Sequence, residues 1–137
     1  MSRTKSPYKA VYAALVARLT RSGINVGGTA GYPRIEVHSI VEDEQLDKNG
    51  DIHSTSLTVE TMTTDSMVTC ADLNDENLQL LQEPLDLSAS AWKCFGIVAR
   101  QLQDLEETSD TQDSIFRLML SVDIFTETAP EPEPENN

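Results

Sequence analysis

One stretch constrains the fold more than any other: residues 32–64 have the pattern of a long β-hairpin. Positions that can face a core alternate with polar ones on both arms, as in a strand with one buried face. They are Ile35, Val37 and Val41 on the first arm and Leu57, Val59 and Thr61 on the return arm. The segment between the arms, Asp47–Asp51, is rich in residues that accept the dihedral angles of a tight turn.

The loop length sets the pairing of the two arms. A two-residue loop would put Val41 and Leu57 on opposite faces, whereas a three-residue loop at residues 48–50 pairs odd positions with odd ones. We therefore predict that Val41 lies opposite Leu57, and Val37 opposite Thr61. The same register makes Leu46 and Ile52 neighbours at the tip, on the face away from the core. This apolar pair is either a docking point for another chain or a harmless exposed pair.

Charge is strongly segregated along the chain. Residues 1–35 contain six basic residues and no acid, whereas residues 36–137 contain all 23 acids and four basic residues, giving +6 and −19. This distribution disfavours non-specific nucleic-acid binding and allows head-to-tail contact between copies. We expect Glu42, Asp43 and Glu44 to face a neighbour's basic residues such as Arg18 or Arg21. The alternative is a solvated acidic surface whose basic first helix is neutralised within its own chain.

Length and composition indicate one domain of 137 residues. No stretch approaches the roughly 20 apolar residues of a membrane helix, and the start has no long apolar run typical of a signal peptide. Cys70 and Cys94 have no metal-like spacing. We expect a soluble protein made in a reducing cytoplasm, with free thiols.

Two main helices are predicted. Ser6 and Pro7 favour a helix start, and apolar residues at three- and four-residue steps indicate a helix over about 7–22 that ends at Gly23. A second helix is predicted over about 89–107, with Trp92, Phe95 and Val98 in its buried stripe. A short helix capped by Asn74 is expected at 74–82, and residues 65–73 are ambiguous between strand and loop.

The last segment with strong periodicity is a strand. Phe116, Leu118, Leu120, Val122 and Ile124 alternate with polar residues and Met119. We place this strand centrally and antiparallel, beside the hairpin. The predicted fold class is α+β, a small antiparallel sheet with a long β-hairpin and two main helices packed on one face. Residues 1–126 form the domain, and the Pro/Glu-rich residues 127–137 are predicted to be a disordered tail.

Catalytic patterns are weak. His38 and His53 are interpreted as exposed strand residues, too far apart along the hairpin to form a dyad. The segment 47–51 resembles the opening of a calcium loop, but Ile52 stands where glycine is needed and Thr58 where glutamate is needed. Trp92 and Phe95 are interpreted as core. We therefore expect no enzyme activity, no cofactor and no metal.

The order of elements resembles the tail-terminator, or tail-completion, proteins of long-tailed bacteriophages over residues 7–126. The similar features are the opening helix at 8–15, the Gly31-Tyr32-Pro33 entry to a strand, the arm at 57–61, residues 98–102 and the last strand. The family commonly has another strand before the Tyr32-Pro33 segment, where this chain is rich in glycine.

The resemblance implies a hexameric ring of this chain in the virion, assembled in the host cytoplasm. The ring would cap the tail tube, join it to the head connector and neck proteins, and carry no catalytic residue or cofactor. An acidic lumen would let DNA pass without binding, because phosphates are repelled. Two other classes compete: an acidic DNA mimic that inhibits a nuclease or restriction enzyme, and a small stand-alone binding module or chaperone.

Overall fold

The computed structural model describes residues 6–27, 31–46, 51–88, 90–102, 108–110 and 113–128. At 39–44, 108–110 and 113–114 it describes the backbone alone. The predicted disordered tail lies outside these residues from 129 onward. Glu127 and Thr128, which were assigned to that tail, belong instead to the last strand, where they pair with Lys93 and Trp92.

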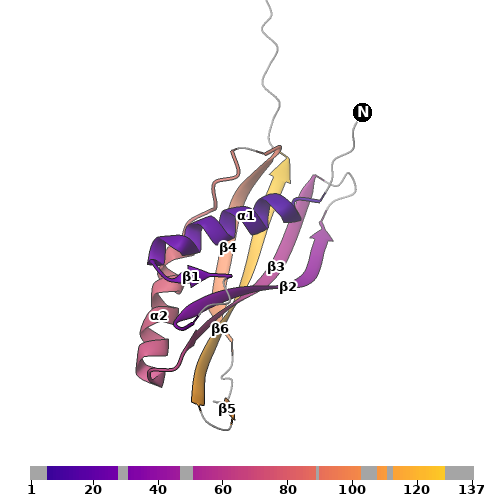
Figure 1. Ribbon diagram of the computed structural model, residues 1–137. Helices are drawn as coiled ribbons and strands as arrows, with labels where there is room; N and C mark the ends of the chain where they lie inside the picture. Colours follow the sequence, from indigo (N-terminus) through magenta and orange to yellow (C-terminus); the bar gives the residue numbers. More distant parts are fainter. Residues whose placement is uncertain are drawn as a thin grey trace, which may run out of the picture.

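The strands form one twisted sheet in the order β1-β2-β3-β6-β4, with β5 pairing β6 (Figure 1). Their bounds are Asn25–Val26 for β1, Arg34–Gln45 for β2, Ile52–Thr63 for β3, Trp92–Gln101 for β4, Thr108–Asp110 for β5 and Asp113–Thr128 for β6. All pairs are antiparallel except β1 with β2, which is parallel. The long last strand lies centrally beside the hairpin, as its alternation predicts.

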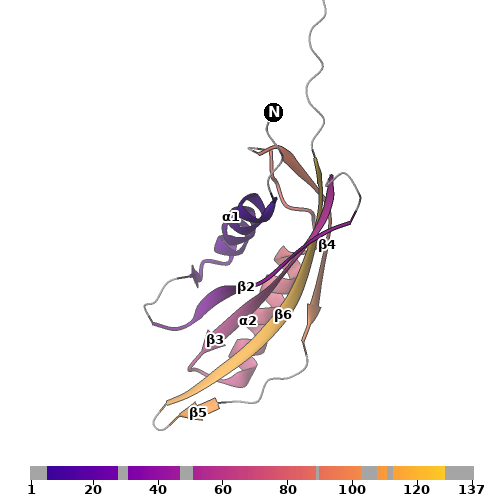
Figure 2. The same ribbon diagram turned by 90° about the vertical axis from the view of Figure 1, so that its right-hand side faces the viewer.

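Helix α1 (Tyr8–Leu19) continues into the short 3₁₀ turn η1 (Thr20–Ser22), and α2 (Met67–Leu80) follows the hairpin. Both helices contribute to the core on the same face of the sheet, and α1 crosses in front of the strands in Figure 1. Figure 2 shows the long strands from the side, with α1 on one side of them. The predicted α+β class with helices on one face is confirmed. Among the described residues, no helix is both long and apolar enough to span a bilayer.

The core lies between this helical layer and the sheet. Alternate residues of β3 and β6 point into it, as a strand with one buried face requires. Its most deeply buried members come from α1, the hairpin and β6: Val11, Leu15, Leu19, Ile35, Leu57, Val59, Leu120, Val122 and Ile124. Burying a side chain of this kind contributes on the order of 1.5–3 kcal/mol, so this layer dominates the stability.

The predicted hairpin is present, but its register agrees with the prediction only near the tip. Near the tip Gln45 pairs with His53, and the Leu46 N–H donates to the Ile52 carbonyl at 2.7 Å, as the three-residue loop requires. A bulge between Ser39 and Glu42 then shifts the lower part by two positions. Ser39 therefore lies opposite Leu57, and Val37 lies opposite Val59, so both predicted cross-strand pairs are wrong.

The helix after the hairpin begins earlier than predicted. Ser66 caps it, and its hydroxyl accepts from the Thr69 N–H at 3.1 Å. Asn74, predicted as the cap, lies inside α2, is buried and donates to Gln101 Oε1 at 2.7 Å. The ambiguous residues 67–73 therefore belong to a helix, and α2 is the second main helix of the fold.

The helix predicted over 89–107 is wrong, because Trp92–Gln101 is strand β4. Trp92 and Cys94 are buried, but Phe95 and Val98 are about half exposed instead of forming a buried stripe. A bulge between Cys94 and Gly96 interrupts the alternation of this strand. Two further short strands are β1, in the Gly-rich stretch before Tyr32, and β5, which lies between β4 and β6 in the sequence.

Candidate functional site

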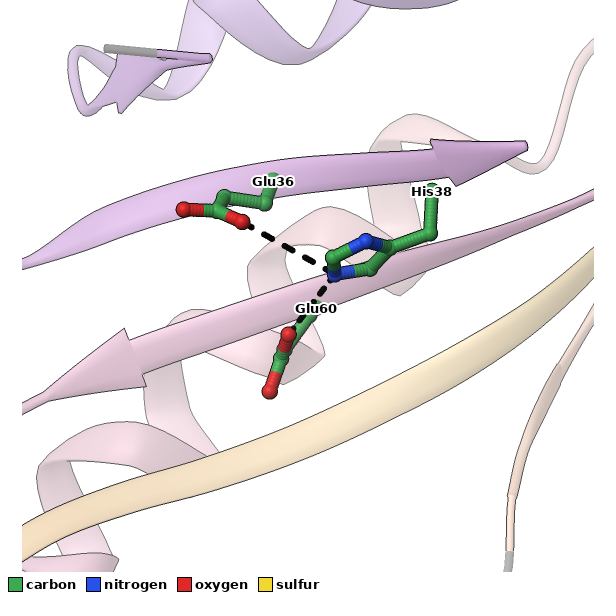
Figure 3. A group of neighbouring side chains, drawn as sticks. All are labelled: Glu36, His38 and Glu60. Atoms are coloured by element: carbon green, nitrogen blue, oxygen red, sulfur yellow. Dashed lines mark hydrogen bonds and ion pairs between the residues drawn. The ribbon is translucent and has the colours of Figure 1, made fainter. Parts of the chain in front are cut away.

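The densest group of titratable side chains lies on the face of the sheet opposite the helices, here called the open face. Glu36 and His38 are two residues apart on β2 and so project to the same side, and Glu60 of β3 is directly opposite Glu36. Nε2 of His38 lies 2.8 Å from Glu60 Oε1 and 3.8 Å from Glu36 Oε1 (Figure 3). The hairpin register therefore brings together three side chains that sequence spacing alone does not join.

Two arginines engage the other oxygens of these carboxylates. Arg34 Nε lies 3.2 Å from Glu36 Oε2, and Arg117 Nε of β6 lies 3.6 Å from Glu60 Oε2. The guanidinium of Arg34 also lies over the ring of Tyr32, 4.8 Å from its centroid. Two carboxylates thus face two guanidinium groups, so the network is balanced in charge when His38 is neutral.

This balance explains an unusual burial. Glu60 is only 5% exposed although no helix covers its face of the sheet within the described residues. A carboxylate removed from water is strongly unfavourable unless it is paired and hydrogen-bonded. From the strands on either side of Glu60, His38 supplies a hydrogen bond at 2.8 Å and Arg117 supplies an ion pair at 3.6 Å.

The ligand atoms of Glu36, His38 and Glu60 all lie within 4.8 Å of one another. One imidazole nitrogen and two carboxylate oxygens suit Zn²⁺ or a similar divalent ion. However, a metal would have to compete with Arg34 and Arg117 for the same carboxylates. The contacts favour an ion-pair network that fixes the hairpin to β6.

Two other side chains that could take part in chemistry, those of His53 and Cys70, are buried on the helix side of the sheet. His53 lies edge-on against Trp92 with 5.0 Å between ring centroids, and it is buried, so its predicted exposure is wrong. The Cys70 thiol contacts the carbonyls of Thr61 and Phe116 at 3.4 Å, and burial raises its pKa to about 11. A raised pKa is the opposite of what a nucleophilic cysteine requires.

The predicted apolar pair lies where the register places it. Leu46 is 47% exposed, and Ile52 is partly buried on the open face. The acidic arm at 42–44 pairs through its backbone with residues 54–56, and its side chains lie outside the described part of the structure. The described end of the hairpin therefore carries one exposed apolar residue, Leu46, on an arm whose sequence is acidic.

The two basic candidates differ from each other. Arg21 is exposed, but the guanidinium of Arg18 donates to three backbone carbonyls at and after the end of α2. These are the carbonyls of Leu80 at 2.8 Å, Glu83 at 3.0 Å and Pro84 at 2.9 Å. Arg18 therefore ties α1 to α2 within the chain, which leaves Arg21 as the more accessible of the two.

Sequence reasoning missed an exposed apolar group on β4 and β6. Phe95 and Val98 are 48% and 47% exposed, and the Phe95 ring lies 6.2 Å from that of Phe125. Their helical spacing suggested a buried stripe instead. Since apolar residues occupy both faces of β4, its sequence lacks the alternation that would have separated the open face from the core.

No family model matches this chain, and no curated protein does. Ten solved chains are similar in structure. One of them superposes with a TM-score of 0.50 and 16% sequence identity, over 90% of this chain and 98% of that one. The superposition supports a shared fold, and 16% identity carries no information about activity or partners.

Proposed function

We propose that this chain is a structural subunit of a phage tail, a terminator that forms a ring, caps the tail tube and joins it to the head connector. The observation that carries the proposal is the exposed Leu46, beside the partly buried Ile52, at the end of a hairpin arm rich in acidic residues. A desolvated apolar centre with charged surroundings is the usual composition of a protein interface.

The charge distribution supports association in one direction. The hairpin arm is acidic, whereas exposed basic residues lie elsewhere on the chain, at Lys9 of α1, Arg21 of η1, and Lys93 and Arg100 of β4. A contact between different surfaces of two copies closes into a ring when the rotation allows it. A net charge of −13 also suits a channel through which DNA passes without binding.

The test compares the wild type with Leu46→Asp by sedimentation and by negative-stain imaging with purified tail tubes. Val68→Asp is the matched control, because Val68 is another exposed aliphatic residue, on α2, and is 71% exposed. We expect rings and capped tubes for the wild type and for Val68→Asp. Leu46→Asp should remain folded by circular dichroism and lose both.

Two results would contradict the proposal. A wild-type monomer that inhibits a nuclease at equimolar ratio would identify the chain as a DNA mimic, using exposed acids such as Asp72, Asp75 and Glu76 of α2. A wild-type monomer that neither caps tubes nor inhibits a nuclease would favour a stand-alone binding module. If Leu46→Asp assembles as the wild type does, the tip is not the interface.

A further inference from the structure

The two outer edges of the sheet belong to strands that can accept a partner. β4 is the last strand on one side, and on the other side β1 pairs only with Arg34 and Ile35 of β2. Among the described residues, no strand pairs with the outer edge of β4, or with the edge of β2 that faces away from β3 beyond Ile35. An unpaired strand edge is a template for pairing with another chain.

The two edges carry opposite charge. β4 contains Lys93 and Arg100 and no acid, and both side chains are exposed. β2 beyond Ile35 contains Glu36, Glu42, Asp43 and Glu44 and no lysine or arginine. Like charges would oppose pairing of β2 with β2 or of β4 with β4, whereas β2 with β4 is attractive.

Apolar groups accompany both edges. Leu46 follows directly after β2 and is about half exposed, and on β4 Phe95 and Val98 are exposed to the same degree. Lone exposed apolar residues are common, but here they lie beside strand edges that have no partner strand among the described residues. Each edge therefore combines strand backbone, charged side chains and exposed apolar surface, and the charges of the two edges are opposite.

Strand direction allows the two edges to meet. β2 is antiparallel to β3, β3 to β6, and β6 to β4, so β2 and β4 run in opposite directions. Copies related by rotation about an axis roughly along the strands keep those directions. β2 of one copy would then lie antiparallel to β4 of the next, and the 10 residues of β4 offer about 33 Å of edge.

We propose that copies of this chain join edge to edge, with β2 of one copy pairing with β4 of the next to continue the sheet. This inference rests on the proposed ring and names the surface that receives the hairpin arm. Because the two surfaces differ, each copy offers one of each, and the contact repeats in one direction around the ring. Lys93 and Arg100 of β4 thus take the place expected for Arg18 and Arg21.

The test uses two charge-reversed variants. Lys93→Glu/Arg100→Glu makes β4 acidic, and Glu42→Lys/Asp43→Lys/Glu44→Lys makes β2 basic. In each variant alone, every junction then brings like charges together. The protein concentration at which half of the chains are assembled should therefore rise at least about tenfold, which corresponds to a loss of about 1.4 kcal/mol in association free energy. A 1:1 mixture restores opposite charges at every junction if the variants alternate, and should sediment like the wild type.

A control matched to the β4 variant also reverses two basic residues but places them away from the edges, at the exposed Lys9 of α1 and Arg21 of η1 (Lys9→Glu/Arg21→Glu). This control should assemble normally. Suppose that the wild type forms rings. If either edge variant then assembles as well as the wild type, or if the mixture does not recover assembly, the edge contact is wrong and the ring proposal stands. If the wild type forms no oligomer, both proposals fail. Circular dichroism confirms that each variant is folded.

Discussion

The guanidinium of Arg18 in α1 holds the carbonyl of Leu80, the last residue of α2, with Nη1 at 2.8 Å from that oxygen. The last four carbonyls of a helix have no partner within the helix, and a cation near them also interacts favourably with the helix dipole. One side chain thus closes the end of α2 and joins it to α1.

Arg18→Met should therefore destabilise the monomer by about 1.5–3 kcal/mol, the range for hydrogen bonds to a charged group. Arg21→Met is the control, because Arg21 is exposed, and should change the free energy of unfolding by less than about 0.5 kcal/mol. Urea denaturation of both variants measures the difference. Equal effects would mean that the clamp contributes nothing to stability.

Trp92 provides a second prediction. It is 5% exposed and packs against the edge of His53, so Trp92→Ala should cost about 3–5 kcal/mol. Native tryptophan fluorescence should be blue-shifted and poorly quenched by iodide, because Trp92 is buried. The signal reports on Trp92 alone, since the chain contains one tryptophan. A red-shifted, freely quenched signal would place Trp92 at the surface and contradict the packing of β4.

Elements with a single clear period could be predicted from the sequence. The first helix and β6 each bury one face more deeply than the other, and both hairpin arms alternate apolar and polar residues in sequence, so their periodicity is unambiguous. The register near the tip was also predictable, because a three-residue loop at residues 48–50 makes Leu46 and Ile52 neighbours. The shift lower down was not, since the bulge between Ser39 and Glu42 has no glycine or proline to mark it.

The two errors in the second half of the chain have separate causes. β4 exposes Phe95 and Val98 and has a bulge after Cys94, so its apolar residues fall by chance at helical steps. In α2 the fully or nearly fully buried side chains include the polar Asn74 and Asn77, which hide the helical stripe. The ion-pair network was missed because Glu36 and Glu60 meet only through the exact pairing of two strands.

The Glu60 network makes a third prediction. Arg117→Leu removes one partner of a nearly buried carboxylate, and His38→Leu removes the other. Either change should destabilise the fold by about 1–3 kcal/mol, because the carboxylate keeps its desolvation cost. Glu60→Gln in the Arg117→Leu background should recover part of the loss. Thermal unfolding of the wild type, Arg117→Leu, Glu60→Gln and the double variant measures this coupling, and full additivity of the two changes would show that the contact carries no energy.

Cys70 makes stability depend on pH. The thiol pKa is raised from 9.0 to about 11, mainly by burial; a backbone hydrogen bond with Leu118 lowers the pKa, and nearby Glu60 contributes to the rise. The unfolded thiol ionises first, so this contribution is fully present below about pH 9 and is lost as pH rises toward 11. Relative to Cys70→Ala, the wild type should lose extra stability in that window. Parallel pH curves for the two proteins would contradict the prediction.

The last prediction concerns the polar contact between α2 and the sheet. Asn77 is fully buried, and its Nδ2 donates to the Thr61 hydroxyl at 2.8 Å, while its Oδ1 has no hydrogen-bond partner among the described residues. Thr61→Val leaves the Asn77 amide donor without a partner and should lower the free energy of unfolding by about 1–3 kcal/mol.

Asn77→Leu leaves the Thr61 hydroxyl without this partner but also removes the unpaired Oδ1, so it should destabilise the protein less. The double variant replaces both partners with apolar groups and should be more stable than the sum of the two single costs predicts. Denaturant unfolding of the four proteins gives the coupling energy. A value near zero would mean that the bond between these two side chains does not hold α2 on the sheet.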